Sequence, residues 1–280
     1  MSQVTSAVIV EPRNHKALDV VIGNVFNSLP NVPIYLHHGI YNEQLAYAIK
    51  KKYPSVVPVN TGNADLNKQE YSKILTQKEF YEKLPDGQTL VFQTDSGFCN
   101  PALAREQLES YKNYDYVGAP WHWWGNKEAV GGNGGFSLRN PRTMEHLISN
   151  EINLKNSVTH HKPKPIYHFP NPKDDFPNPE DYWLSALCEA DKTCRLPPLE
   201  VAGKFASGSG SIRFSTDLTD SHTVSPDPAK KIYCADFGTP IGIHYPSNIC
   251  SKVFDCDPVL TLPTGNFTSS ELEEKIRSLR

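Results

Sequence analysis

Short apolar runs alternate with amphipathic segments over the first hundred residues. Continuous apolar runs of four to six residues are typical of buried strands, and apolar residues at a spacing of three or four are typical of helices. Their alternation predicts parallel strands joined by right-handed helical crossovers. The strand-like segments are Ala7–Val10, Pro33–His37, Ser55–Val59 and Leu90–Phe92, and helical spacing marks Leu18–Phe26, Asn42–Lys51 and Phe80–Leu84, the last preceded by a capping-box pattern at Thr76–Glu79.

The fourth strand-like run ends at a polar sequence, Gln93-Thr94-Asp95-Ser96. Open α/β sheets bind ligands outside the carboxyl ends of their strands. Asp95 is therefore placed where a ligand or a hard divalent cation would lie. Its position is equally compatible with a carboxylate that only caps the following turn.

Past residue 100 the alternation stops, and a glycine-rich segment and a proline-rich segment follow. Gly131–Gly135 surrounds Asn133 with backbone that a substrate can approach closely, although an ordinary hairpin loop would also use such residues. Lys162–Pro179 contains too many prolines for a regular helix or a central strand. We expect a long surface loop there, of the kind that forms active-site lids.

Three ionisable residues further along could carry chemistry. Glu180 and Asp181 open a helix, where they are either a general base with its neighbour or simple charge placement at the helix N-terminus. His244 follows the apolar sequence Ile241-Gly242-Ile243 and is either structural or a second ligand of a metal held by Asp95.

Composition narrows the class of protein. The chain has 280 residues, of which 38% are hydrophobic and 21% charged, enough to bury the core of one large domain. A net charge of -3 without a basic cluster argues against nucleic acid as a partner. A mean hydropathy of -0.48 and the lack of a long apolar run argue against a membrane span. No basic region precedes an apolar segment at the start, so we expect no signal peptide and a cytoplasmic location.

The absence of certain motifs argues against two common enzyme classes and indicates the state of the cysteines. No G-x-G-x-x-G follows the first strand and no G-x-x-x-x-G-K-S/T occurs, which argues against a dinucleotide enzyme and a P-loop NTPase. None of the six cysteines forms a C-x-x-C pair, so without a secretory signal we expect free thiols. Three aromatic residues offer flat faces for a sugar ring or for core packing, namely Trp121, Trp123 and Trp124.

Taken in order, four motifs resemble a known family: Gln93–Ser96, Tyr114–Trp121, Gly132–Arg139 and Glu180-Asp181. The set resembles the GT-A-type glycosyltransferase-like family that was first catalogued as a domain of unknown function and is common in large viruses. Within that family, the chain looks most similar to the chlorella-virus glycosyltransferases that build capsid glycans. The resemblance spans roughly residues 7 to 260. It implies an α/β, GT-A-like fold with a Rossmann-type mixed sheet flanked by helices, in a single domain over residues 1–264, followed by a tail with a short helix over 265–280.

The pattern is also similar, more distantly, to the fringe and β-1,3-glycosyltransferase group, in which a D-x-D motif and a late histidine bind metal. This resemblance implies Mn²⁺ or Mg²⁺ on Asp95 and His244, with Asp181 as the base and Glu180 in reserve. Gln93 stands in place of the first acid of D-x-D, which leaves one carboxylate for the metal. The implied donor-binding residues are Arg13, Gln93, Thr94, Asp95, Ser96, Asn133, Gly134 and Gly135, and the implied acceptor-binding residues are Trp121, Trp123 and Trp124.

The function implied is transfer of a sugar from a nucleoside-diphosphate sugar to a hydroxyl group of a glycan. The resemblance points first to UDP-xylose as donor, to a viral capsid glycan as acceptor and to the host cytoplasm as location. A single displacement with Asp181 as base would invert the anomeric configuration. Two alternatives remain: a nucleotide-sugar or glycan-binding protein without turnover, which Gln93 favours, and a nucleotide-sugar hydrolase.

Overall fold

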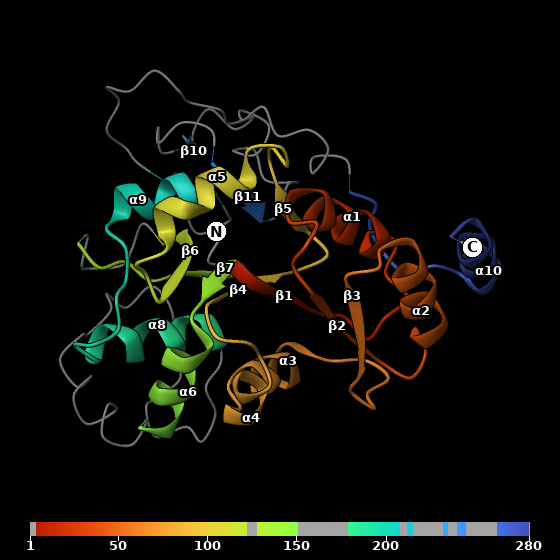
Figure 1. The fold of residues 1–280 in the computed structure, drawn as a ribbon, viewed down its shortest axis with the longest axis horizontal. Helices are drawn as coiled ribbons and strands as arrows, with labels where there is room; N and C mark the ends of the chain where they lie inside the picture. The colour runs from red at the N-terminus through yellow and green to blue at the C-terminus, as the bar shows by residue number, and fades with distance from the viewer. Residues whose placement is uncertain are drawn as a thin grey trace.

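A six-stranded mixed sheet forms the centre of the molecule in the computed structural model, which describes residues 4–121, 128–150, 179–207, 212–214, 232–234, 240–244 and 262–279 (Figure 1). Its strands are β1 (Val4–Val10), β2 (Ile34–His38), β3 (Val56–Asn60), β4 (Gln88–Phe92), β6 (Tyr116–Pro120) and β7 (Gly132–Arg139). They are ordered β3-β2-β1-β4-β7-β6. The first four pair in parallel, as the alternation predicts, and β7 pairs antiparallel with both β4 and β6.

Helices cover both faces of this sheet. The helices are α1 (Leu18–Ser28), α2 (Glu43–Lys52), α3 (Lys68–Leu75), α4 (Lys78–Glu82), α5 (Ala104–Leu108), α6 (Pro141–Ser149), α8 (Glu180–Ala190), α9 (Leu199–Phe205) and α10 (Ser269–Ser278), with a short 3-10 helix, η1 (Glu109–Tyr111), after α5. Figure 1 shows α1, α5 and α9 on one side of the sheet and α3, α4, α6 and α8 on the other. The fold is the α/β sandwich of helices around a mixed sheet that the sequence predicts.

Two hydrophobic clusters fill the spaces on the two sides of the sheet. Successive residues of β1 point to opposite faces, so Ala7 and Ile9 join one cluster and Val8 and Val10 join the other. All four are buried, because a central parallel strand is covered on both faces. This is why the strand reads as an unbroken apolar run in the sequence.

A second, three-stranded sheet brings distant residues to the end of β4. It consists of β5 (Ser96–Phe98), β11 (Gly242–His244) and β8 (Ala206–Ser207), in the order β5-β11-β8. The antiparallel register of β5 and β11 places His244 opposite Ser96. A separate two-stranded sheet pairs β9 (Ile212–Phe214) with β10 (Ile232–Cys234).

The capping box predicted at Thr76 is wrong. Thr76 lies at the end of α3, where its hydroxyl donates to the carbonyl of Ser72. The capping box belongs to the start of α3, where Asn67 and Glu70 satisfy each other's backbone N–H groups. The sequence pattern misleads because Thr76 is already engaged by the helix that it closes.

The segment that ends in α10 is tied to the start of the chain. The Nζ atom of Lys275 in α10 lies 2.6 Å from Oδ2 of the buried Asp19 in α1. The Oε1 atom of Glu271 lies 2.9 Å from Nζ of Lys16. Ile276 and Leu279 are buried in the larger hydrophobic cluster. The predicted tail therefore includes a helix that packs on the domain.

The prediction of free thiols is wrong for Cys188 and Cys194, which form a disulfide between the end of α8 and the turn that follows it. The chain reverses within six residues and brings the two Cα atoms to 5.1 Å, a distance that a disulfide spans. Cys99 is also disulfide-bonded. Because disulfides persist mainly in oxidising compartments, the cytoplasmic location stays a prediction. No helix in the described ranges is long and apolar enough to cross a membrane.

Candidate functional site

A tight turn presents Asp95 at the carboxyl end of β4. The hydroxyl of Ser96 donates to the carbonyl of Gln93 and accepts from its backbone N–H, both at 2.9 Å. Ser96 is fully buried and fixes the turn, whereas the Asp95 side chain keeps 37% of its surface exposed. The structure thus places Asp95 and Gln93 at the strand end as predicted, with Thr94 between them half-buried.

His244 joins Asp95 and Gln93 to make a compact group of nitrogen and oxygen atoms. Its Nε2 atom lies 3.0 Å from Gln93 Oε1 and 3.3 Å from Asp95 Oδ1. Burial alone would raise the pKa of Asp95, but the hydrogen bond and the charge of His244 outweigh it, so the pKa is lowered from its ordinary value. An imidazole nitrogen with two oxygens suits a borderline divalent cation such as Mn²⁺.

This group carries less negative charge than most metal sites, because Asp95 is its one carboxylate. Within the described ranges, no three His, Cys, Asp or Glu side chains gather as such a site would need. The third donor atom here is the amide oxygen of Gln93, which stands where the related pattern has an acid. The residues fit a divalent cation whose remaining ligands come from a diphosphate, because Mn²⁺ and Mg²⁺ accept few protein ligands when they bridge phosphates.

Two neighbouring glycines of β7 separate this group from a pair of carboxylates. Gly135 faces His244, and a side chain there would overlap the imidazole ring. Gly134 faces the other way, where a Cβ would lie 2.7 Å from Glu180 Oε1 and 2.9 Å from Asp181 Cβ. The glycine-rich segment is thus part of a central strand rather than a hairpin loop, and the absence of side chains lets both groups approach its backbone.

Asp181 is buried at the first turn of α8 and held by backbone donors. Its Oδ2 accepts from the N–H of Gly134 at 2.9 Å, and its Oδ1 accepts from the N–H of Tyr182 at 2.7 Å. Burial, and then the charge of Glu180, raise the pKa of Asp181 to about 7. A carboxyl group with such a pKa can take a proton at neutral pH.

Glu180 forms an ion pair with a buried arginine that the sequence analysis did not single out. Arg139 is fully buried, and its guanidinium donates to Glu180 Oε1 at 3.2 Å and to the hydroxyl of Tyr81 at 3.1 Å. Ser72 donates to the other carboxylate oxygen at 3.3 Å. The two acids therefore differ: Glu180 neutralises Arg139, and Asp181 has no cationic partner at hydrogen-bonding distance among the described residues. A charged residue ending the strand run Phe136–Leu138 was the available signal for Arg139.

The loop after β1 adds Arg13 and His15 to the site. The hydrogen bond with Glu11 raises the pKa of Arg13, and the charge of Asp95 adds to this rise. Burial lowers the pKa of His15, and the charges of Glu11 and Asp95 only partly oppose this effect. Glu11 accepts two hydrogen bonds from the Arg13 guanidinium, each at 2.8 Å, and the buried Asn42 donates to the carbonyls of Glu11 and Arg13. Donor binding by Arg13 stays a prediction, and His15 was missed because a histidine in a loop carries no pattern.

The predicted acceptor side is only partly described. Trp121 is 6% exposed and packs with Val130 and Ala202, with Tyr182 beside it. Asn133 is half-buried, and its side chain accepts from the N–H of Gly135 at 2.9 Å. Acceptor binding by Trp121 stays a prediction. Trp123 and Trp124 lie outside the described residues, as does the predicted lid apart from Pro179.

Comparison with known proteins gives one family and a distant structural likeness. No curated protein matches the sequence. The fold is similar to that of 4-diphosphocytidyl-2C-methyl-D-erythritol synthase from Anaerococcus prevotii DSM 20548, with 11% identity, a TM-score of 0.39, and coverage of 54% of this chain and 75% of that one. A likeness of this size bears on neither substrate nor activity. The family described as "Protein of unknown function (DUF5672)" matches residues 57–220, more than half of the chain, and the chain belongs to it.

Proposed function

We propose that the protein is a metal-assisted glycosyltransferase that moves a sugar from a nucleoside-diphosphate sugar to a hydroxyl group of a glycan. The observation that carries this proposal is the buried Asp181, whose raised pKa suits a general base and which lies across β7 from the His244 group. A displacement at an anomeric carbon needs a base for the incoming hydroxyl group and a positive charge for the leaving group. The candidate base lies on one side of β7, and the candidate cation-binding group lies on the other.

The roles follow from what each group can do. Asp95, His244 and Gln93 would hold Mn²⁺ or Mg²⁺, which when bound neutralises the charge of the diphosphate leaving group. Arg13 adds a positive charge on the same side of the site. Asp181 accepts the proton of the attacking acceptor hydroxyl, and Glu180 pairs with Arg139. Attack opposite the leaving group inverts the anomeric configuration.

The finer assignment rests on the resemblance of the motifs. It favours a UDP-sugar, with UDP-xylose as the first donor to try, and a glycan such as that of a viral capsid protein as acceptor. The strand ends that present Asp95 and Arg13 are the edge at which open α/β sheets bind nucleotides, which supports a nucleotide on this side.

The test is a transfer assay with a panel of UDP- and GDP-sugars, glycan acceptors and Mn²⁺. We expect transfer from one donor, and Asp181→Asn should slow it by about 10²- to 10⁴-fold while donor binding survives. Thermal shift measures that binding, because a ligand of the native state raises its stability. Binding without any transfer would make the protein a nucleotide-sugar-binding protein, and donor breakdown without transfer would make it a hydrolase.

A further inference from the structure

Tyr71 of α3 carries a buried hydroxyl that makes no hydrogen bond within the part of the chain that the structure describes. Burial raises the pKa of this hydroxyl, and the nearby charge of Glu180 raises it further, so the group keeps its proton at neutral pH. A buried donor without an acceptor is unfavourable, and proteins retain few of them. The Tyr71 hydroxyl is therefore a donor without an acceptor at hydrogen-bonding geometry among the described residues, although the Gln93 side chain lies close enough to lower its pKa.

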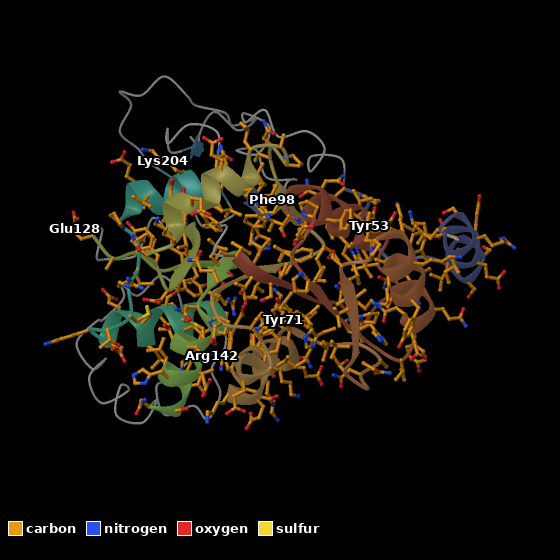
Figure 2. All side chains as sticks on the ribbon, viewed as in Figure 1. Tyr53, Tyr71, Phe98, Glu128, Arg142 and Lys204 are labelled. Carbon is orange, nitrogen blue, oxygen red and sulfur yellow. A yellow bond between two sulfur atoms is a disulfide. The ribbon has the colours of Figure 1, made fainter. Side chains whose placement is uncertain are left out.

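The hydroxyl lies near residues from both halves of the candidate site. It is close enough to Glu180, Asp181 and Gln93 for each to influence its pKa. Ser72, the next residue, holds α3 against the start of α8 through its hydrogen bond to Glu180. Figure 2 shows Tyr71 at α3, toward the strands of the central sheet.

The neighbouring acceptor atoms already have other donors. Both oxygens of Glu180 accept, one from Arg139 and one from Ser72. Both oxygens of Asp181 accept from backbone N–H groups. The Oε1 atom of Gln93 lies beside the His244 imidazole. An acceptor that arrives with a substrate would satisfy the remaining donor.

We propose that the Tyr71 hydroxyl donates a hydrogen bond to a hydroxyl group of the transferred sugar and so selects donors that carry it. This inference rests on the proposed function and adds a specificity-determining residue to it. In the proposed reaction the sugar, unlike the nucleotide, lies between the leaving group and the base, and the Tyr71 hydroxyl is near both Gln93 and Asp181. Part of Tyr71 is exposed, although its hydroxyl oxygen is buried.

Tyr71→Phe separates sugar recognition from nucleotide recognition, because it removes only the hydroxyl. Calorimetric titration with Mn²⁺ gives Kd for UDP, and for whichever of UDP-xylose, UDP-glucose and UDP-galactose the wild type binds most tightly. We expect the Kd for UDP to stay unchanged and the Kd for the UDP-sugar to rise about 3- to 10-fold, the usual effect of losing one neutral hydrogen bond. Unchanged sugar affinity, or equal losses for both ligands, would overturn the role of Tyr71 and leave the proposed function standing. A wild type that binds neither UDP nor any UDP-sugar would overturn both.

Tyr81→Phe is the matched control, because its hydroxyl is buried on the same side of the sheet but donates to Leu75 and accepts from Arg139. We expect Tyr81→Phe to lower the Tm of the unliganded protein, and Tyr71→Phe to leave it unchanged or raise it. If Tyr71→Phe lowers the Tm as much as Tyr81→Phe does, the Tyr71 hydroxyl serves the fold and the inference is wrong.

Discussion

The backbone of Gly135 lies directly against the imidazole of His244, so close that any side chain at this position would overlap the ring. The backbone of the preceding residue, Gly134, lies directly against Glu180 and Asp181 on the opposite side of β7, where a side chain would also overlap its neighbours. Two successive residues of one strand therefore carry the two halves of the candidate site, because successive residues of a strand face opposite ways.

Alanine at each glycine should damage one half and spare the other. Gly135→Ala should displace His244 and abolish the Mn²⁺-dependent thermal shift caused by UDP, because the imidazole cannot keep its place beside an added methyl group. Gly134→Ala should displace Arg139, Glu180 and Asp181 instead, slowing transfer while the Mn²⁺-dependent shift persists. Identical defects in the two variants would show that β7 does not divide the site.

Asp95→Ala should abolish the stabilisation that UDP gives in the presence of Mn²⁺. The fold should remain intact, because more than a third of the Asp95 side chain is exposed at a strand end. His244→Ala should act in the same direction but less strongly. Asp86→Ala is the control, since its carboxylate is 88% exposed and pairs with Arg142. An unchanged effect of Mn²⁺ in Asp95→Ala would refute the metal assignment.

Glu180→Gln and Asp181→Asn should differ in stability. Replacing Glu180 leaves the charge of the fully buried Arg139 without its partner, which should lower the free energy of unfolding by about 3 kcal/mol or more. Replacing Asp181 removes a buried carboxylate that repels Glu180 but leaves one of its two backbone donors without an acceptor, so the loss at pH 8 should be smaller, about 1 kcal/mol. Urea unfolding measures both. Equal destabilisation by the two substitutions would contradict the separate roles given to these acids.

Stability and transfer should both depend on pH through Asp181. Its pKa is raised from 3.8 to about 7 in the folded protein, so between these values the folded state holds a proton that the unfolded state has lost. The resulting stabilisation is full below about pH 4 and is lost as the pH rises through 7. Wild type should therefore lose stability relative to Asp181→Asn over this range, measured by urea unfolding at a series of pH values.

Transfer by the wild type should increase over the upper part of the same range, as Asp181 becomes able to accept a proton. This limb of the pH–rate profile should be missing from Asp181→Asn. A wild-type rate that does not change between pH 5.5 and 8 would mean that another group titrates or that no base is needed.

Removing the Cys188–Cys194 disulfide should lower stability without touching the donor side. The double variant Cys188→Ser, Cys194→Ser should lose about 2 kcal/mol of unfolding free energy, as expected for a short closed loop. The loop retains other contacts, since Asp191 accepts from the N–H and the hydroxyl of Thr193. Labelling of free thiols in the unreduced protein checks the pairing itself, and two reactive thiols at these positions would exclude it.

The sequence predicts the parallel half of the fold well. Each of its four strands contains a short run of apolar residues. In β1 and β4 this run is buried on both faces, so the pattern alone reveals Ala7–Val10 and Leu90–Phe92. In β2 buried residues alternate with half-buried ones, and β3 is covered least. The strand end at Asp95 and the strand before His244 follow from the same signal. The first half of the antiparallel strand β7 shows no strand pattern, because glycines replace its apolar residues where the two groups approach.

The contacts that distinguish one site residue from another depend on tertiary structure. Nothing local separates Glu180 from Asp181; their different surroundings arise because Arg139 reaches one and the N–H of Gly134 reaches the other. The meeting of His244 with Gln93 depends on pairing between β5 and β11, across 151 positions of sequence. The disulfide likewise depends on how the chain turns after α8.

The link between the two ends of the chain sets the order in which the site is completed during synthesis. The loop that carries Arg13 and His15 is held by residues more than 240 positions later: Lys16 donates its backbone N–H to Gly265, and Phe267 donates to Asn14. Contacts of such long sequence separation form late in folding. On the ribosome, the loop after the first strand therefore emerges early, and Asn42 can hold its first part, but its second part gains these two hydrogen bonds only when residues 262–279 have followed. A chain truncated before residue 262 would keep every strand of the central sheet and would leave the second part of this loop without them.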